Sequence, residues 1–416
     1  MIRSMYTAIS SLNLQQKYLD VVSNNLANSN TIGFKASRVL SQDQFSQMMS
    51  PGSSPTATQG GVNPIQIGLG VNLGYISSNF TQGVLQSTGR NMDLGIQGDG
   101  FFIYGNENRR YSREGSMSLD MDGYLVNSAS GLRTQGWLAD ASGVIDNNIP
   151  VDDISIVTDN TLARATATVN LGGNLSAGTA LNGTYNVTMG VYDSLGALQT
   201  ATVQFTRGAT AGVTPNITTQ WSWALVNDPA TAVAEAGDGT ITFDENGQYV
   251  SDTPGAPIVL QTSTGADAFD LTVDFSKLTM LSATSTVAVT SQDGLPAGTV
   301  TDVYISPNDG IISLMYSNGM SEQVGQVALA RFNNPTGLMK ADDTTFLPGL
   351  NSGDPQIGAG NTGGRGSIAA SYLEASNVDM AQEFTNMILA QRGFQASSRV
   401  ITTSDEILQE LVNLKR

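Results

Sequence analysis

The sequence contains no histidine and no cysteine among its 416 residues. Without imidazole and thiol groups, the chain cannot build Ser-His-Asp or Cys-His catalysis, histidine ligation of haem, or the common zinc and copper sites. It cannot form a disulfide either, so cysteine usage does not indicate its compartment. We therefore expect no catalytic residue, no cofactor and no metal ion, and a protein that is not an enzyme.

Charged residues are also scarce, at 13% of the chain, and most are acidic, which gives a formal net charge of -17. An acidic surface repels nucleic acid and the anionic inner face of a membrane. The sequence has no run of about 18 apolar residues, and its amino terminus lacks the pattern of a secretory signal. We expect no nucleic-acid binding, no membrane insertion and, if the protein is exported, a route without a cleaved signal peptide.

Apolar residues near the amino terminus recur at alternating steps of three and four, which is the spacing of a coiled-coil seam. Asparagine and glycine residues at 28–33 then favour the end of the helix. At about 1.5 Å per residue this helix would be roughly 40 Å long. The seam consists of Met5, Ile9, Leu12, Leu19 and Leu26.

The carboxy-terminal region has a similar stripe after Ser376 and Asn377, which are good helix N-cap types. An ordinary domain core is the alternative explanation for either stripe. However, the two helices stand at opposite ends of the chain and neither has a neighbouring helix in the sequence. We therefore predict that both seams are subunit interfaces; the second consists of Met380, Phe384, Met387, Phe394, Ile401, Leu408 and Val412.

Between the helices, short alternating runs separated by Gly, Asn and Asp turns indicate strands. One expected hairpin joins Tyr185–Val191 to Val203–Phe205 through a turn at Asp193–Gly196. The predicted fold is mainly β with coiled-coil-like terminal helices, a discontinuous β domain and an inserted all-β domain. The expected boundaries are 1–35 and 372–416 for the helices, 36–62 for a linker, 63–150 and 301–371 for the discontinuous domain, and 151–300 for the insertion.

Two motifs match ligand-binding patterns, one for a dinucleotide and one for calcium, but each lacks a part that binding requires. Residues 358–363 match G-x-G-x-x-G, but the strand and helix that give a dinucleotide fingerprint its mechanism are not expected there. Asp120 and Asp122 have the spacing of a calcium loop, yet glycine follows too early and no Glu stands at the twelfth position. We expect a hairpin turn instead. No spacing singles out a carboxylate pair of the glycosidase type.

Residues 23–35 read SNNLANSNTIGFK and resemble the amino-terminal signature of bacterial flagellar rod and hook proteins. Segments 376–379, 391–395 and 401–406 resemble the carboxy-terminal helix of the same family. Within it, the chain length and the segments 316–319 and 325–330 favour hook proteins over the shorter distal rod proteins. The residues that carry the amino-terminal signature are Asn25, Asn28, Asn30, Thr31, Gly33, Phe34 and Lys35.

The resemblance implies a structural subunit that assembles into the tubular, flexible flagellar hook, which links rod to filament and transmits motor torque. It implies an inner tube of terminal helices, a middle layer from the discontinuous β domain and an outer layer from the insertion. The implied partners are other copies of the chain, the distal rod, the hook cap, the hook-filament junction proteins and the type III export apparatus. The implied location is the hook and basal body at the cell exterior.

Two alternatives remain open from the sequence. The first is another axial part, either the distal rod or a hook-associated protein, which would use the same terminal helices. The second is a secreted β-rich hydrolase or adhesin, which would stay monomeric with both helices intact.

Overall fold

The computed structural model describes residues 2–56, 58–106, 108–212, 217–226, 232–235, 237–255, 258–262 and 265–414. The chain divides into two compact units. Unit 1 holds Met1–Ile156, Val303–Ser313 and Gln323–Arg416, and unit 2 holds Val157–Asp302 and Leu314–Glu322. Long helices occur at the two ends and strands make up most of the rest, so the prediction of a mainly β chain with terminal helices is confirmed.

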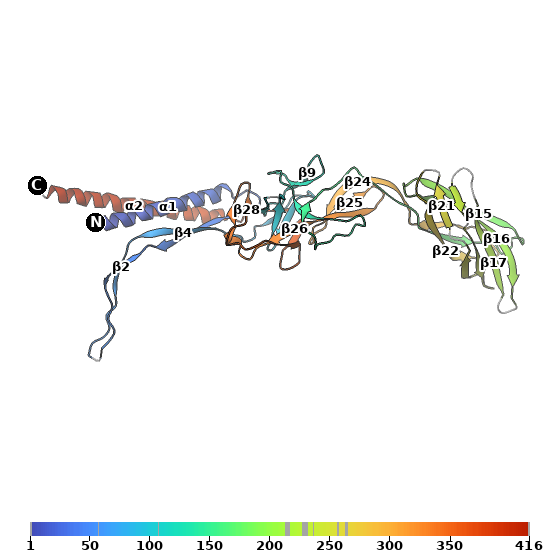
Figure 1. Cartoon of the computed structure of the whole chain (residues 1–416), viewed down its shortest axis with the longest axis horizontal. Helices are drawn as coiled ribbons and strands as arrows, with labels where there is room; N and C mark the ends of the chain where they lie inside the picture. Colours follow the sequence, from blue (N-terminus) through green and yellow to red (C-terminus); the bar gives the residue numbers. More distant parts are fainter. Residues whose placement is uncertain are drawn as a thin grey trace. The chain divides into compact units, whose positions relative to one another are not determined.

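The two long helices of unit 1 are α1 (Ile2–Ala27) and α2 (Met380–Asn413). They lie side by side and run antiparallel (Figure 1), with the Oγ atoms of Ser11 and Ser397 2.9 Å apart. The side-chain amide of Gln15 on α1 packs against Gly393 of α2, and a Cβ atom there would stand 2.8 Å from its nitrogen. Although neither helix has a neighbour in the sequence, each has a partner within the chain.

After α1 the chain forms a ribbon of strands before it enters the β region. Strand β1 (Ser37–Asp43) pairs with β4 (Val71–Ser78), and β2 (Ser46–Ser50) pairs with β3 (Ile65–Gly68), all antiparallel. Residues 36–62, expected as a linker, thus contribute β1 and β2. The blue ribbon in Figure 1 leads from the helices to the end of this hairpin.

The remaining strands of unit 1 join segments that are far apart in the sequence. β5 pairs with β31, β6 with β30 and β7 with β26. A core to which β7, β8, β11, β26, β28 and β29 contribute includes Phe101, Tyr111, Trp137 and Phe346. The elements are β5 (Leu85–Ser87), β6 (Leu94–Gln97), β7 (Phe101–Tyr104), β8 (Arg110–Ser112), β9 (Met117–Leu119), β10 (Leu125–Asn127), β11 (Gln135–Leu138), β12 (Asp152–Asp153), β26 (Ser321–Arg331), the 3-10 turn η1 (Pro335–Gly337), β27 (Met339–Lys340), β28 (Thr345–Leu347), β29 (Gln356–Ala359), β30 (Ser367–Ala370) and β31 (Tyr372–Glu374).

Unit 2 contains two five-stranded sheets, in the orders β18-β21-β22-β14-β23 and β15-β16-β17-β19-β20. Alternating residues from both sheets fill one core that includes Val169, Phe205, Trp221 and Phe275. The strands are β13 (Thr161–Arg164), β14 (Thr168–Asn174), β15 (Thr184–Tyr192), β16 (Leu198–Ala211), β17 (Thr218–Val226), β18 (Ala232–Glu235), β19 (Asp238–Phe243), β20 (Tyr249–Pro254), β21 (Ile258–Thr262), β22 (Phe269–Thr279) and β23 (Ala288–Gln292). Strands β24 (Leu295–Ile305), β25 (Ile311–Tyr316) and β26 contain three of the four boundaries between the units, and the fourth follows Ile156.

Four turns share one hydrogen-bond pattern, in which an Asp carboxylate accepts the N–H groups two and four residues later. The glycine at the fourth position has a positive φ in each, as at Gly123 with φ 81°. At Asp120 the carboxylate accepts from Asp122 and Tyr124, so the expected hairpin turn is confirmed there. The other three turns begin at Asp140, Asp193 and Asp244.

Candidate assembly surfaces

The structure separates the predicted seam residues into two sets by their exposure. One set is half-buried, because these side chains lie toward the partner helix or the neighbouring strands of the same chain: Met5, Leu12, Leu19, Leu26, Met387, Ile401 and Leu408. The other set is exposed to solvent: Ile9, Met380, Phe384, Phe394 and Val412. An interface with other copies remains a prediction for both sets.

Several small side chains of α1 and α2 are buried in the chain. Ala8, Ala390 and Ser404 are buried, and Ser397 meets α1 through its hydroxyl. Positions 390, 393, 397 and 404 repeat with steps of three, four and seven, so they form a heptad seam of small residues. A search for large apolar residues misses this seam. The regular spacing of small residues in the sequence would have predicted it.

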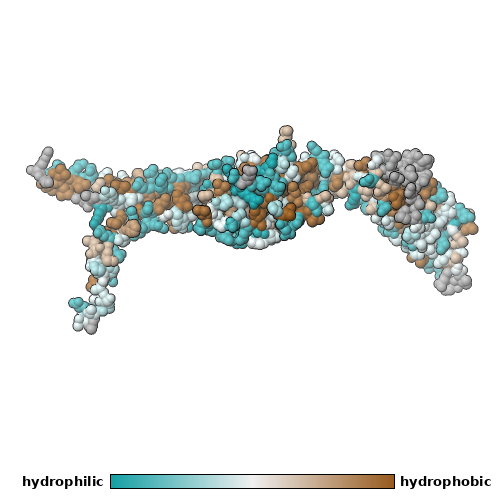
Figure 2. All heavy atoms as spheres, in the orientation of Figure 1, coloured by the Kyte–Doolittle hydropathy of each residue, from teal (hydrophilic) through white to brown (hydrophobic). Residues whose placement is uncertain are grey.

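Large apolar side chains lie on the outer surface of the helix pair instead, among polar ones. Brown spheres mark them along the helices in Figure 2. Phe384, for example, is 51% exposed. Exposed apolar patches of this kind are typical of sites where proteins bind one another. The exposed residues are Tyr6, Ile9, Met380, Phe384, Ile388, Leu389, Phe394, Val400, Ile407, Leu411, Val412 and Leu414.

The first signature residues shape the turn that follows α1. The side chain of Asn25 is buried, donates to the carbonyl of Ser37 at 2.8 Å and accepts the Ser37 N–H at 2.9 Å. Asn28 accepts the hydroxyl proton of Thr31 at 3.1 Å, while Asn30 is exposed in the turn. These residues therefore return the chain toward β1.

The later signature residues attach this turn to the β region of unit 1. Gly33 has φ 69°, and a Cβ atom there would stand 2.6 Å from the backbone nitrogen of Glu114, so only glycine fits. Phe34 is buried, with the Lys340 ammonium 4.8 Å from its ring centroid. Lys35 is fully buried and ion-paired.

A buried charge cluster joins the two ends of the chain at this point. One carboxylate oxygen of Glu374 lies 2.6 Å from Lys35 Nζ, and the other lies 3.3 Å from Arg113 Nη1. The Gly83 N–H also donates to Glu374 at 2.7 Å. Burial lowers the pKa of Lys35 and of Arg113, and the Glu374 charge opposes both shifts. Glu374 therefore compensates two cations that are buried with it.

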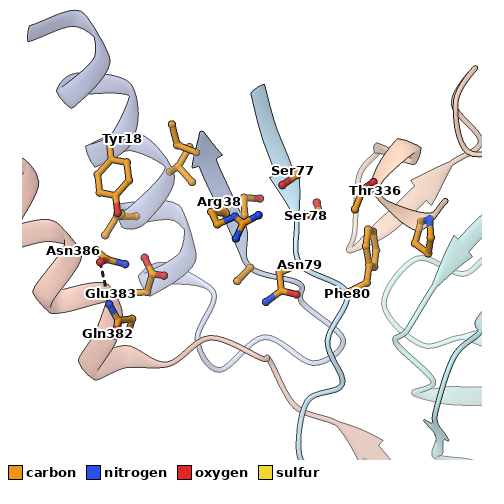
Figure 3. A pocket seen from close by; sticks show the side chains of 16 residues that line it. Tyr18, Arg38, Ser77, Ser78, Asn79, Phe80, Thr336, Gln382, Glu383 and Asn386 are labelled. Atoms are coloured by element: carbon orange, nitrogen blue, oxygen red, sulfur yellow. Dashed lines mark hydrogen bonds between the residues drawn. The ribbon is translucent and has the colours of Figure 1, made fainter. Parts of the chain in front are cut away.

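A groove of about 500 Å³ lies between α1, the first turn of α2 and the strands β1 and β4. Figure 3 shows Tyr18, Arg38 and Glu383 around it. The Oε2 atom of Glu383 is buried and has no hydrogen-bond partner among the described residues. Burial raises the pKa of Glu383, and side-chain hydrogen bonds from Asn25 and Asn386 oppose this effect.

Glu383→Gln is expected to stabilise the unassembled chain at pH 7. A carboxyl group whose pKa is higher in the folded state than in the unfolded state stabilises the fold at a pH below its ordinary pKa of about 4.3. This stabilisation is lost as the pH rises through the pKa of the folded state. The gain should be below about 1 kcal/mol, because Glu383 is half exposed and solvent screens its charge. Thermal unfolding between pH 3.5 and pH 7 measures it.

The difference between variant and parent should vanish at the acidic end of that range. Glu406→Gln, an exposed site on the same helix, is the matched control. A Glu383→Gln variant less stable than the parent at pH 7 would contradict the assignment of a burial cost.

The described residues contain no cluster of three or more acidic side chains suited to a metal ion. Within the same part of the chain, no helix has the length and hydropathy to cross a membrane.

Comparison with protein families finds four matches along the chain. The models are Flagella basal body rod protein at residues 5–35, Flagellar hook protein FlgE/F/G D1 domain at 95–177, Flagellar basal body protein FlaE D2 domain at 159–295 and Flagellar basal body rod FlgEFG protein C-terminal at 369–414. Together with the terminal helices and the β units, these matches define the class of flagellar rod and hook proteins.

Similar proteins cover the full length of the chain. Flagellar hook protein FlgE of Borreliella burgdorferi is 38% identical and that of Treponema pallidum is 35% identical, each over 100% of both chains. The flagellar basal-body rod protein FlgG of Bacillus subtilis is 29% identical, also over 100% of both. The chain belongs to the flagellar hook protein family. A crystal structure of Helicobacter pylori flagellar hook protein FlgE2 is similar with a TM-score of 0.48 and 16% identity, over 70% of this chain and 100% of that chain.

Proposed function

We propose that this chain is the structural subunit of the flagellar hook. It assembles with further copies into a flexible tube that links rod to filament and transmits motor torque. The observation that carries the proposal is the apolar outer surface of the α1–α2 pair, which the fold of one chain leaves exposed. Covering large apolar side chains contributes about 1.5–3 kcal/mol for each one fully buried, and other copies supply that cover.

The helix pair forms the inner wall of the tube, with the predicted seam residues as its contacts. Residues 63–150 and 301–371 form a middle layer, and residues 151–300 form an outer layer. Polar outer surfaces make weak, hydrated contacts that exchange neighbours as the tube bends. The helices at the ends thus give cohesion, and the β regions give flexibility.

Further partners follow from the same position in the flagellum. The distal rod, the hook cap and the hook-filament junction proteins would meet the ends of the tube. An export apparatus would deliver the chain to the cell exterior. Hydrolase or redox activity is not part of this function. A rod or hook-associated role is less favoured, because two hook relatives exceed the rod relative in identity.

Negative-stain electron microscopy of the concentrated full chain tests the proposal. Tubes of constant diameter are expected, and they should curve, unlike a straight rod. A chain shortened to residues 28–379 should stay dispersed under the same conditions, because it lacks both helices but keeps the strands and the buried pair of Lys35 and Glu374. A full chain that stays monomeric at high concentration would rule out the proposed assembly.

A further inference from the structure

The G-x-G-x-x-G match lies in a loop that connects two strands of unit 1. Strand β29 ends at Ala359 and β30 begins at Ser367, so no helix follows the motif. We call residues 358–366 the glycine loop. Asn361, Gly363 and Gly364 all have positive φ angles, of 58°, 57° and 75°. This loop does not bind a dinucleotide in the usual manner, because a helix N-terminus is missing.

Two arginine side chains lie against the glycine loop. A Cβ atom at Gly363 would stand 3.0 Å from Nη2 of Arg365, and one at Gly364 would stand 2.8 Å from Nη1 of Arg331. At Gly358 a Cβ atom would collide with the Arg365 guanidinium. The glycines therefore leave the space that both guanidinium groups occupy.

The guanidinium of Arg365 is held in place by the loop itself. Its Nε donates to the carbonyl of Ala359 at 3.1 Å, and its Nη2 donates to the hydroxyl of Thr362 at 2.8 Å. Arg331 ends strand β26, which pairs with β29. The Arg365 guanidinium is thus fixed to the end of β29, and the backbone of Arg331 is fixed to the same strand pair.

The two cations lack a carboxylate partner within the described part of the chain. Neither Arg331 nor Arg365 forms an ion pair there. Burial lowers the pKa of Arg365, and the positive charge of Arg331 lowers it further, so the two cations lie close enough to repel each other. The backbone carbonyl of Asp99 accepts the Gly366 N–H, and the negative charge of the Asp99 carboxylate raises the pKa of Arg113. Two adjacent guanidinium groups without a carboxylate favour an added anion.

We propose that Arg365 on the glycine loop and Arg331 at the end of β26 beside it form a carboxylate-binding site that receives an Asp or Glu side chain from a second copy of the chain. This inference rests on the proposed hook assembly. Guanidinium groups bind carboxylates through paired N–H donors, which fixes geometry as well as charge.

The acidic composition favours a second copy as the source of the carboxylate. The chain has 36 acidic and 19 basic residues, so copies of it repel one another on average. Every copy also brings a surplus of carboxylates to its neighbours. A half-buried pair of cations that still reaches the surface is therefore a place where attraction between copies replaces that repulsion and fixes how they meet.

Charge reversal of each arginine tests the site. Sedimentation measures the critical concentration for assembly of Arg331→Glu, Arg365→Glu and the parent. Each variant should need at least about ten times the parent concentration, which corresponds to about 1.4 kcal/mol per contact. Lys277→Glu is the matched control, because it makes the same charge change at an exposed lysine of unit 2. Thermal unfolding establishes that every variant is folded.

A second variant identifies the partner. Arg365→Lys keeps the charge and adds an amine that a zero-length carbodiimide joins to a touching carboxylate. In assembled protein, mass spectrometry should find this bond between two copies, and dispersed protein should lack it.

Two results would overturn the site while leaving the hook assembly intact. One is parent and charge-reversed variants that assemble at the same concentration. The other is inorganic phosphate binding to the dispersed parent with no effect of either reversal on assembly, which would mean a free-anion site only. A parent that forms no tubes would instead overturn the proposed function and this inference together.

Discussion

Phe384→Asp and Phe394→Asp are each expected to abolish tube formation without lowering the stability of the dispersed chain. Both side chains are exposed, at 51% and 41%, so the fold of one chain depends little on them. In a tube each aspartate would place an unpaired carboxylate in an apolar contact, which costs several kcal/mol. Because every subunit repeats the contact, the cost recurs along the polymer. Sedimentation and thermal unfolding measure the two effects separately.

Gln395→Asp is the control, since it adds the same charge at an exposed polar site on the same helix. It should assemble at a concentration near that of the parent. Leu19→Asp and Ile401→Asp should also prevent assembly, but both residues are half-buried within the chain and the helix pair would weaken as well. Normal tubes from both phenylalanine variants would show that the outer surface of the helices is not the polymer interface.

Glu374→Gln should destabilise unit 1 by about 3–5 kcal/mol, because it leaves two buried cations without their counter-charge. The side chains of Glu374 and Lys35 are fully buried, and that of Arg113 is nearly so. Thermal unfolding followed by calorimetry should show the transition of unit 1 at a lower temperature. The transition of unit 2 should stay in place, since none of the three residues belongs to it.

Asp20→Asn removes an acid from an exposed ion pair with Lys17, whose nitrogen lies 3.9 Å away. Its effect should be below about 1 kcal/mol. If Glu374→Gln were as mild as Asp20→Asn, the buried cluster would not hold the chain ends to the β region.

Local rules in the sequence predict the parts of the fold that local chemistry determines. The Asp-x-x-Gly turns are an example, because one carboxylate and one glycine within five residues define each turn. The terminal helices are another, since their apolar periodicity acts over a few turns. The N-cap lies later than predicted, however: Asp379 caps α2 by accepting two backbone N–H groups of its first turn, and neither Ser376 nor Asn377 does so. Ser11 and Ser397, by contrast, meet across 386 residues, and nothing local links them.

Residues 36–62 and the charge cluster also depend on contacts between distant parts of the chain, which local sequence rules do not predict. The polar sequence of this segment resembles a connector, but cross-strand pairing with residues 65–78 makes a ribbon of it. Lys35 was recognisable only as part of a family signature. Its partner Glu374 lies 339 residues away, so its role in a buried ion pair depends on the tertiary fold.

The junction beneath the helices also has a mechanical consequence. Two covalent connections leave the helix pair there, one after α1 and one before α2. The Lys35–Glu374 pair bridges them, and Asn377 accepts the Ala36 N–H at 2.8 Å. A force applied to the helices is therefore shared by two linkages in parallel with a brace between them. Such an arrangement resists shear and twist at the junction far better than a single flexible connection about whose bonds the chain can rotate.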